Sequence, residues 1–223
     1  MNRTTAYATT AGIAAPRQPA APAGEASAPL PSPLVRDLRE RAGRSPHALL
    51  FGPKDLAVVT GLPGSGKSTL MHRAVRGARR VDSQDTRDRW AQRMPRFLPY
   101  ALYRPLVRLA HYVGLRRALR AGEGVVVHDC GTQAWVRRWL AREARRRGGT
   151  LHLLLLDVTP EQALAGQRAR GRGVSRYAFL RHRAAATRLL RAAERGDLPR
   201  GCGSAILLDR DAADALRRIG FTG

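Results

Sequence analysis

The sequence predicts an α/β sandwich built on a parallel sheet, and three observations support this fold class. Short apolar runs recur along the chain, and segments with helical periodicity lie between them. A glycine-rich loop joins the first of these runs to the next helical segment. Runs that are apolar on successive residues indicate strands buried on both faces, which are typical of parallel sheets covered by helices.

Taken in order, the elements begin after residues 1–33, which are rich in Ala and Pro, lack hydrophobic periodicity, and are predicted to be a disordered tail. Residues 34–223 are predicted to be one domain, which opens with a short helix that Ser32 caps and Gly43 ends. Five strands are predicted at 56–60, 80–82, 125–127, 151–156 and 205–208. Helices are predicted at about 133–147, after Thr159 as a cap, and around 180–190.

The charge balance is strongly basic. Lys and Arg number 40 against 17 Asp and Glu, which gives a net charge of +23. Such a chain attracts polyanions, namely nucleic acid, an anionic membrane surface or phosphorylated metabolites. Two cysteines exclude a disulfide framework, and the apolar runs are far shorter than a membrane span of about 20 residues, so we expect a cytoplasmic protein without stable membrane insertion.

The glycine-rich loop carries the firmest functional prediction. Residues 61–68 fit the pattern G-x-x-x-x-G-K-[ST] between a predicted strand and a predicted helix. Glycines allow backbone amides to surround a phosphate, Lys67 contacts the β- and γ-phosphates, and the Ser68 hydroxyl is a ligand for Mg²⁺. The residues predicted to bind ATP here are Gly61, Leu62, Pro63, Gly64, Ser65, Gly66, Lys67, Ser68 and Thr69.

Acidic residues follow two of the predicted strands, at the edge where parallel sheets bind ligands. Asp129 is predicted to be a second Mg²⁺ ligand, with a helix cap as the alternative. Asp82 is predicted to be the base that accepts the proton of an attacking hydroxyl, with Asp85 as a second candidate. The alternative for Asp82 is a cap for the helix that follows. His128 is expected to be a hydrogen-bonded structural residue.

Arginines alternate with glycines at about 166–176, after the fourth predicted strand. We expect this segment to form a lid over the nucleotide, with a solvated basic loop as the alternative. Arg170 is predicted to stabilise the transferred phosphoryl group, and Arg168 and Arg172 to contact the nucleotide.

These residues resemble the P-loop kinases and ATPases that include bacteriophage polynucleotide kinase, zeta toxins and chloramphenicol phosphotransferase, which are AAA-type ATP-binding proteins. The resemblance covers about 55–221 and implies a five-stranded parallel sheet, a lid and transfer of the ATP γ-phosphate to a hydroxyl. Aligned with chloramphenicol phosphotransferase, the base falls on Asp82. Aligned with polynucleotide kinase, it falls on Gln84, with Asp85 and Arg87 matching its neighbours. An earlier basic lid position is Gly166 here.

The resemblance is weakest at about 90–123, where these kinases insert elements that recognise the substrate. Tyrosines interleaved with arginines at 100–112 are suited to stacking on bases. A helical hairpin packed over the sheet is the favoured alternative. A membrane-surface helix is a third, against which Pro105 and the short length argue.

The resulting prediction is an enzyme that uses ATP and Mg²⁺ as a kinase, with a nucleic-acid 5′-hydroxyl or a small hydroxyl compound as acceptor. One alternative is a regulatory ATPase without an acceptor. The other is a basic nucleic-acid-binding protein gated by ATP. The acceptor and the oligomeric state are left open.

Overall fold

The computed structural model describes residues 34–41, 43–95, 97–128, 133–171 and 173–222. The chain separates into two units, of which Ser32–Gly223 contains every described element. The predicted tail, residues 1–33, lies outside the described residues.

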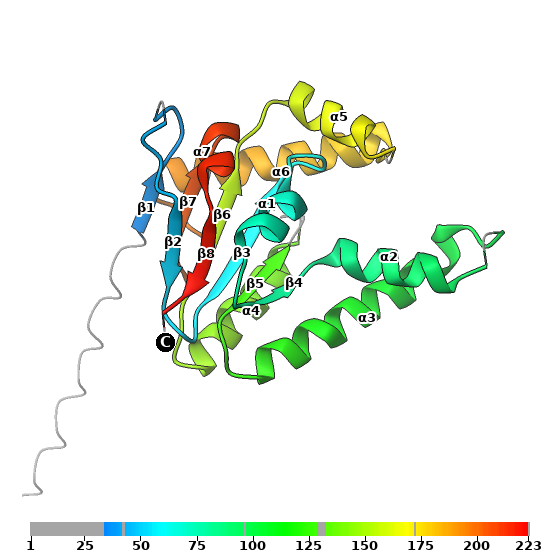
Figure 1. Ribbon diagram of the computed structural model, residues 1–223, viewed down its shortest axis with the longest axis horizontal. Helices are drawn as coiled ribbons and strands as arrows, with labels where there is room; N and C mark the ends of the chain where they lie inside the picture. The colour runs from blue at the N-terminus through cyan, green and yellow to red at the C-terminus, as the bar shows by residue number, and fades with distance from the viewer. Residues whose placement is uncertain (1–33, 42, 96, 129–132, 172, 223) are drawn as a thin grey trace, which may run out of the picture. The chain divides into compact units, whose positions relative to one another are not determined.

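A six-stranded parallel sheet forms the centre of the fold (Figure 1). Its strands, in spatial order, are β1 (Leu34–Asp37), β7 (Cys202–Leu208), β6 (Leu151–Leu156), β3 (Leu56–Gly61), β5 (Val125–His128) and β4 (Arg79–Val81). The central strand β3 is buried along its whole length, between β6 and β5. The loop that follows β3 therefore emerges at the middle of the sheet's carboxyl edge.

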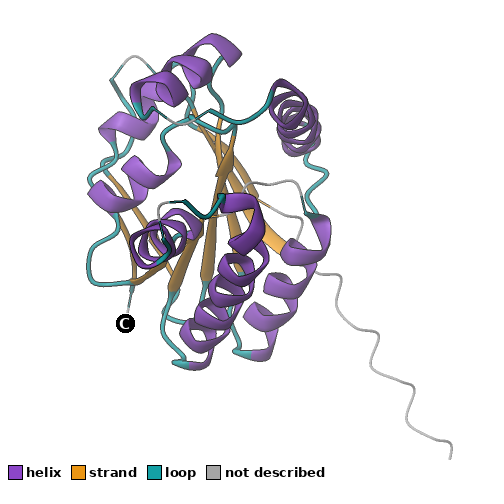
Figure 2. Ribbon diagram, turned by 90° about the vertical axis from the view of Figure 1, so that its right-hand side faces the viewer, coloured by secondary structure: helices purple, strands orange, loops and turns teal. Residues whose placement is uncertain are grey.

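Helices cover both faces of the sheet (Figure 2). They are α1 (Lys67–Ala74), α2 (Ser83–Arg93), α3 (Tyr100–Arg120), α4 (Ala134–Arg146), α5 (Pro160–Ala169), α6 (Arg176–Glu194) and α7 (Arg210–Ala215). Successive residues of a strand point to opposite faces, so Leu56 and Val58 contact the core under α3, α4 and α6. Ala57 and Val59 contact the other core, under α1 and α7.

A second, two-stranded sheet closes the face that carries α1. Here β2 (Ala48–Phe51) pairs in parallel with β8 (Arg218–Phe221), and its inward side chains Leu49 and Ile219 join the same core as Ala57. Two short segments from opposite ends of the domain thus complete this layer.

All five predicted strands are confirmed, and so are the helices expected at 133–147, after Thr159 and around 180–190. The helix predicted between Ser32 and Gly43 is wrong, because Leu34–Asp37 forms β1 and pairs with β7. The sheet accordingly has six strands rather than five. A predicted helix of about ten residues is only marginally stable by itself, whereas pairing with β7 satisfies the backbone groups of Leu34–Asp37.

The segment at 90–123 forms the favoured helical hairpin, in which α2 and α3 lie side by side next to β4 (Figure 1). Helix α3 continues through Pro105 for 21 residues, so that proline does not interrupt it. In the described part of the chain, no helix is both long enough and apolar enough to span a membrane.

Candidate nucleotide and acceptor site

The loop of residues 61–68 has the geometry of an anion-binding site. It leaves β3 and enters α1, as predicted, and Gly64 and Gly66 adopt left-handed conformations with φ of 89° and 93°. Gly66 is the N-cap of α1, so the unpaired amides of the first helical turn face the loop. A helix N-terminus with a loop of this kind is suited to binding phosphate.

Lys67 is held inside this loop. Its side chain is buried, and Nζ donates hydrogen bonds to the carbonyl oxygens of Gly61 at 3.0 Å and Leu62 at 2.6 Å. An ammonium group at this place brings a positive charge to the centre of the loop. The arrangement is consistent with the predicted role of Lys67 in contacting phosphates.

Helix α5 packs directly against the loop. A Cβ at Gly166 would lie 2.3 Å from the carbonyl oxygen of Gly64, and a Cβ at Gly64 would lie 2.1 Å from that of Ala163. Both contacts need glycine. The glycine found at the earlier basic lid position is therefore required by this packing.

Gln167 connects the loop to the segment after α5, and sequence reasoning missed it. Its buried side chain donates from Nε2 to the carbonyl oxygen of Pro63 at 3.0 Å and accepts from the amide of Val174 at 3.0 Å. The residue does not stand out as a ligand type. Gln167 lies one helical turn after Ala163, which packs against the loop. This spacing is the signal in the sequence that would have placed Gln167 beside the loop.

Asp82 lies at the end of β4 and is fully buried. Its Oδ1 accepts the amide hydrogen of Gln84 at 2.8 Å, so it caps α2, and it lies 3.1 Å from Nδ1 of His128. Burial alone would raise the pKa of the Asp82 carboxyl. The hydrogen bonds and charge from His128, Gln84 and Ser68 outweigh burial and hold this pKa far below its ordinary value.

The second oxygen of Asp82, Oδ2, is buried and lacks a hydrogen-bond partner among the described residues. One oxygen of Asp82 therefore caps α2, which is the alternative prediction. The other oxygen lies in the same carboxylate next to Ser68 and lacks a hydrogen-bond donor among the described residues. His128 is hydrogen-bonded as expected, since Nδ1 also lies 2.8 Å from the Ser83 hydroxyl.

Asp85 points into an ion-pair network. It contacts Arg80 at 3.1 Å and His72 at 3.3 Å, and Arg80 also contacts the His72 ring. The ligand atoms of His72, Asp82 and Asp85 lie within 4.8 Å of one another. Arg80 already neutralises the Asp85 carboxylate. His72, Arg80 and Asp85 therefore form an ion-pair cluster beside the site.

A large cleft of about 1240 Å³ extends from the loop to the α2–α3 hairpin. One wall contains Gln84, Arg87 and Asp88 from α2 with residues of α3, and the opposite wall contains Arg170 and the start of α6. Among the described residues, Asp88 is the acid that lines this cleft, and it accepts a hydrogen bond from Gln84 Nε2 at 3.1 Å. Sequence reasoning did not select Asp88, although its spacing of four from Gln84 places both on one helix face.

Arginines around the cleft differ in their placement. Arg170 donates from Nη2 to the Thr69 hydroxyl at 3.0 Å, so it lies beside the first turn of α1. The guanidinium of Arg87 lies 4.2 Å from the centre of the Tyr100 ring. Arg168 is exposed and lines none of the described pockets. Two further predicted residues, Asp129 and Arg172, lie outside the described residues.

A smaller pocket of about 200 Å³ adjoins the other side of the loop. It is lined by Thr69 and Arg73 of α1, by Arg170, and by Arg210 and Asp214 of α7. Arg210 approaches closely, since its Nη1 would lie 3.3 Å from a Cβ at Gly66.

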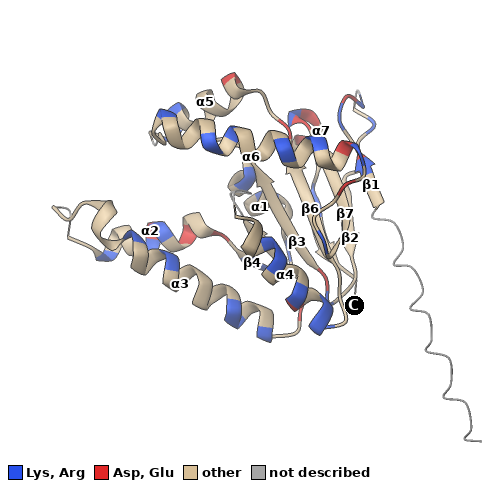
Figure 3. Cartoon of the chain, turned by 180° about the vertical axis from the view of Figure 1, so that it is seen from behind, with Lys and Arg blue, Asp and Glu red and all other residues tan. Residues whose placement is uncertain are grey.

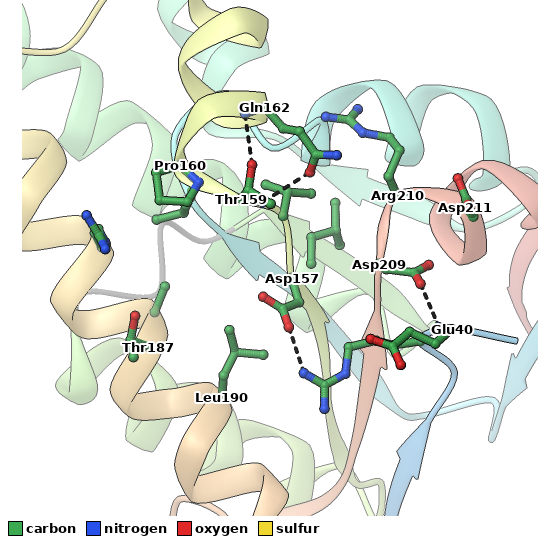
Figure 4. A pocket seen from close by; sticks show the side chains of 16 residues that line it. Glu40, Asp157, Thr159, Pro160, Gln162, Thr187, Leu190, Asp209, Arg210 and Asp211 are labelled. Carbon is green, nitrogen blue, oxygen red and sulfur yellow. Dashed lines mark hydrogen bonds and ion pairs between the residues drawn. The ribbon is translucent and has the colours of Figure 1, made fainter.

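A third cavity, of about 530 Å³, lies at the carboxyl ends of β6 and β7 (Figure 4). Two of its acidic groups are already paired. Asp157 accepts a hydrogen bond from Arg39 at 2.6 Å, and Asp209 accepts from the Glu40 amide at 2.7 Å and caps α7. These contacts join β1 to the sheet, which is a structural role.

The match to known proteins identifies the class to which this fold and loop belong. Residues 56–195 match the family described as the AAA domain, a P-loop nucleotide-binding class. The chain belongs to that family, and the resemblance inferred from the sequence is confirmed at this level. No curated protein sequence is significantly similar to the chain.

Several solved structures are similar to this chain at low identity. A kinase-annotated crystal structure from Chloroflexus aurantiacus J-10-fl is 16% identical, with 73% of this chain and 88% of that chain covered and a TM-score of 0.47. The PezAT toxin–antitoxin system of Streptococcus pneumoniae is 15% identical, with 79% and 80% covered and a TM-score of 0.47. A gluconokinase from Sinorhizobium meliloti 1021 is 18% identical, with 74% and 92% covered and a TM-score of 0.40.

Proposed function

We propose that this protein is a phosphotransferase that moves the ATP γ-phosphate to a hydroxyl group of an acceptor in the large cleft. The observation that carries the proposal is the continuity of this cleft from Lys67 to Asp88. A phosphate-binding loop at one end and a carboxylate at the other are the two groups that such a transfer needs. A nucleotide-hydrolysing switch would not need a cavity of this size beyond the phosphate loop.

ATP is assigned to the loop and to the smaller pocket beside it. Lys67 and the loop amides would bind the phosphates. The pocket between α1, Arg170 and Arg210 is contiguous with the loop and is proposed to take the nucleoside. The guanidinium group of Arg210 beside this pocket is suited to stacking against a flat base.

Mg²⁺ fits the residues next to the loop. The Ser68 hydroxyl and the unpartnered Oδ2 of Asp82 are the hard oxygen donors that this ion prefers, and Asp129 is proposed to complete the set. When bound, Mg²⁺ supplies charge neutralisation at the phosphates. The low pKa of Asp82 keeps its carboxylate charged at all physiological pH values.

Asp88 is the group proposed to accept the proton of the acceptor hydroxyl, in place of the predicted Asp82. A base must reach the hydroxyl, and Asp88 lines the cleft whereas the Asp82 side chain is buried below it. Gln84 orients Asp88 through its side-chain amide. Arg170, next to the loop, is proposed to stabilise the charge on the transferred group.

The test measures label from γ-labelled ATP with Mg²⁺, with and without a single-stranded oligonucleotide that has a 5′-hydroxyl. A panel of small sugar-like and antibiotic-like hydroxyl compounds forms the second arm. The native protein is compared with Lys67→Ala, Asp82→Asn and Asp88→Asn. Asp197→Asn is the matched control, because Asp197 is an exposed acid that pairs with Arg195 away from the cleft.

Label on one acceptor class supports the proposal and identifies the acceptor. Asp88→Asn should lower transfer at least about 100-fold while ATP binding persists. Asp82→Asn should raise the Mg²⁺ concentration needed for activity. Release of label only as free phosphate in every arm would reject transfer in favour of the ATPase alternative. Strong loss in Asp82→Asn at saturating Mg²⁺, with none in Asp88→Asn, would restore Asp82 as the base.

A further inference from the structure

Helix α3 has apolar residues on two different faces. One face is buried: Val107, Leu115, Ala118 and Leu119 pack against the protein. These residues account for the attachment of the helix to the sheet, through contacts with β4 and β5. The other apolar face is not used by any of this packing.

The second face is exposed to solvent. It consists of Leu102, Leu106, Leu109 and Val113, which are 41 to 67% exposed. We call this set the α3 stripe. Its spacing of four, three and four residues places all four side chains on one line along the helix. From Leu102 to Val113 the stripe is about 17 Å long.

Exposed apolar side chains concentrate in this part of the molecule. Five of the twelve large hydrophobic residues that are 40% or more exposed, among those described, lie between positions 97 and 113. The fifth is Phe97, which is 85% exposed in the loop that joins α2 to α3. A contiguous exposed apolar surface of this kind marks an interaction site, whereas scattered single residues would not.

The charged residues of this part of the chain are all basic. Between Asp88 and Glu123 the chain has eight arginines and no acidic residue over 34 positions. By helical geometry Arg116, Arg117 and Arg120 continue the line of the α3 stripe, and all three are exposed. Figure 3 shows basic residues at this end of α3 with no acidic residue on the helix.

We propose that the α3 stripe docks on the surface of an anionic lipid bilayer, with α3 lying in the plane of the interface. A line of Leu and Val side chains that is continued by arginines matches the apolar and anionic layers of such a surface. The arginines contact lipid phosphates while the stripe enters the boundary between headgroups and acyl chains. This surface is separate from the cleft, because Arg104 and Arg108, which line the cleft, lie on another side of the helix.

Other occupants fit less well. A second copy of this chain would bring arginine-rich helices together, and the net charge of +23 opposes that association. A nucleic acid would engage the arginines but would leave the apolar stripe unused. A partner helix docks in a groove, whereas the stripe is a ridge along one exposed helix.

Sedimentation with lipid vesicles tests the proposal on the full chain. Vesicles of phosphatidylglycerol mixed with phosphatidylcholine are compared with phosphatidylcholine alone at about 150 mM salt, where long-range attraction is screened. The variant Leu106→Asp/Leu109→Asp removes the stripe. The control Leu164→Asp/Leu180→Asp makes the same change at exposed leucines of α5 and α6. Thermal unfolding and ATP binding verify that each variant is folded.

The native protein and the control should bind the mixed vesicles, and the stripe variant should bind at least about tenfold more weakly. Arg116→Gln/Arg117→Gln/Arg120→Gln should also weaken binding. Equal binding by the stripe variant would show attraction by net charge alone and would overturn the proposal. So would an absence of vesicle binding, or a dimer in sedimentation velocity that the stripe variant dissociates.

Discussion

Two glycines set the distance between the phosphate-binding loop and α5. Gly64 adopts a left-handed conformation that side chains rarely accept, and Gly166 lets the α5 backbone meet the Gly64 carbonyl. Helical glycine is ordinarily destabilising, so its use inside α5 indicates that close contact with the loop matters more than helix propensity.

The variant Gly166→Ala should therefore weaken both folding and nucleotide binding. The added Cβ would meet the Gly64 carbonyl oxygen and displace the loop or α5, at a cost of about 1–3 kcal/mol in unfolding free energy and about tenfold in ATP affinity. Urea unfolding and calorimetric titration with ATP measure the two effects. Gly114→Ala in α3 is the control, because a Cβ there meets nothing within 4 Å, and it should stabilise the protein by ~0.5–1 kcal/mol. Equal behaviour of the two variants would contradict this account of Gly166.

The charge of Asp82 contributes to the stability of the fold. Its pKa in the folded protein lies far below the ordinary value of 3.8, which approximates that of the unfolded chain. A group with a depressed folded pKa stabilises the fold above the unfolded pKa, and this stability is lost as the pH falls through the folded pKa. The contribution of Asp82 is thus complete at neutral pH and declines below about pH 3.8.

Asp82→Asn isolates this charge, since asparagine still caps a helix. We expect the variant to be less stable than the native protein by about 1–3 kcal/mol at pH 7, and the difference to narrow below pH 3.8. Urea unfolding of both proteins from pH 7 to pH 3 measures it. A difference that does not change with pH would mean that shape rather than charge is responsible.

At the scale of elements, α5 is the part that joins the loop to the segment before α6. It begins with a capping box between Thr159 and Gln162, and near its end Gln167 contacts both Pro63 and Val174. Two hydrogen bonds from one buried side chain link the loop to this segment. We therefore expect the segment before α6 to respond to the state of the phosphate site.

The variant Gln167→Ala should uncouple the phosphate-binding loop from the segment before α6. Loss of both hydrogen bonds should raise amide exchange at Val174 and in the loop, and should lower ATP affinity by about 5- to 20-fold. Hydrogen exchange with and without ATP is the measurement. The neighbouring, exposed Arg168→Ala serves as control and should change neither quantity. A larger effect from Arg168→Ala would instead support the nucleotide contact predicted from the sequence.

The elements that the sequence predicts well are those with an unambiguous local pattern. Central strands such as β3 and β6 are apolar along their length because they are buried on both faces. The strands β1, β2 and β8 have four residues each and lie at edges or in the small sheet. Their pairing partners are far away in sequence, so no local pattern identifies them.

The residues of the candidate site also differ in how well the sequence predicts them. The loop from Gly61 to Ser68 is predictable because each position has a chemical requirement that sequence spacing reveals. The proposal of Asp88 as the base, in place of the predicted Asp82 or Asp85, depends on which carboxylate faces the cleft. That is decided by the turn between β4 and α2 and by the packing of α3, neither of which is visible in spacing.

At the scale of the whole molecule, the charge of +23 acts against the fold. Arginines exceed acids across the surface, and like charges at these distances repel each other. Salt reduces this repulsion, because the screening length falls from about 20 Å at low ionic strength to about 7 Å at 0.2 M.

Unfolding should therefore require more heat as salt is added. Raising sodium chloride from about 20 mM to about 200 mM should stabilise the protein by about 1 kcal/mol, which is about 2–4 °C in Tm for a domain of this size. Calorimetry measures the shift. Lys67→Ala is the control for anion binding at the loop and should show the same shift. A shift confined to the native protein would assign the effect to that loop.

The pairing of β1 with β7 and of β2 with β8 has a consequence for synthesis on the ribosome. Leu34 pairs next to Ser204, and Ala48 next to Arg218, so the first two strands made receive their partners last. Until then their backbone groups and the buried side chain of Leu38 stay uncovered while the central strands assemble. The nascent domain therefore cannot complete either sheet until residues 202–221 have left the exit tunnel.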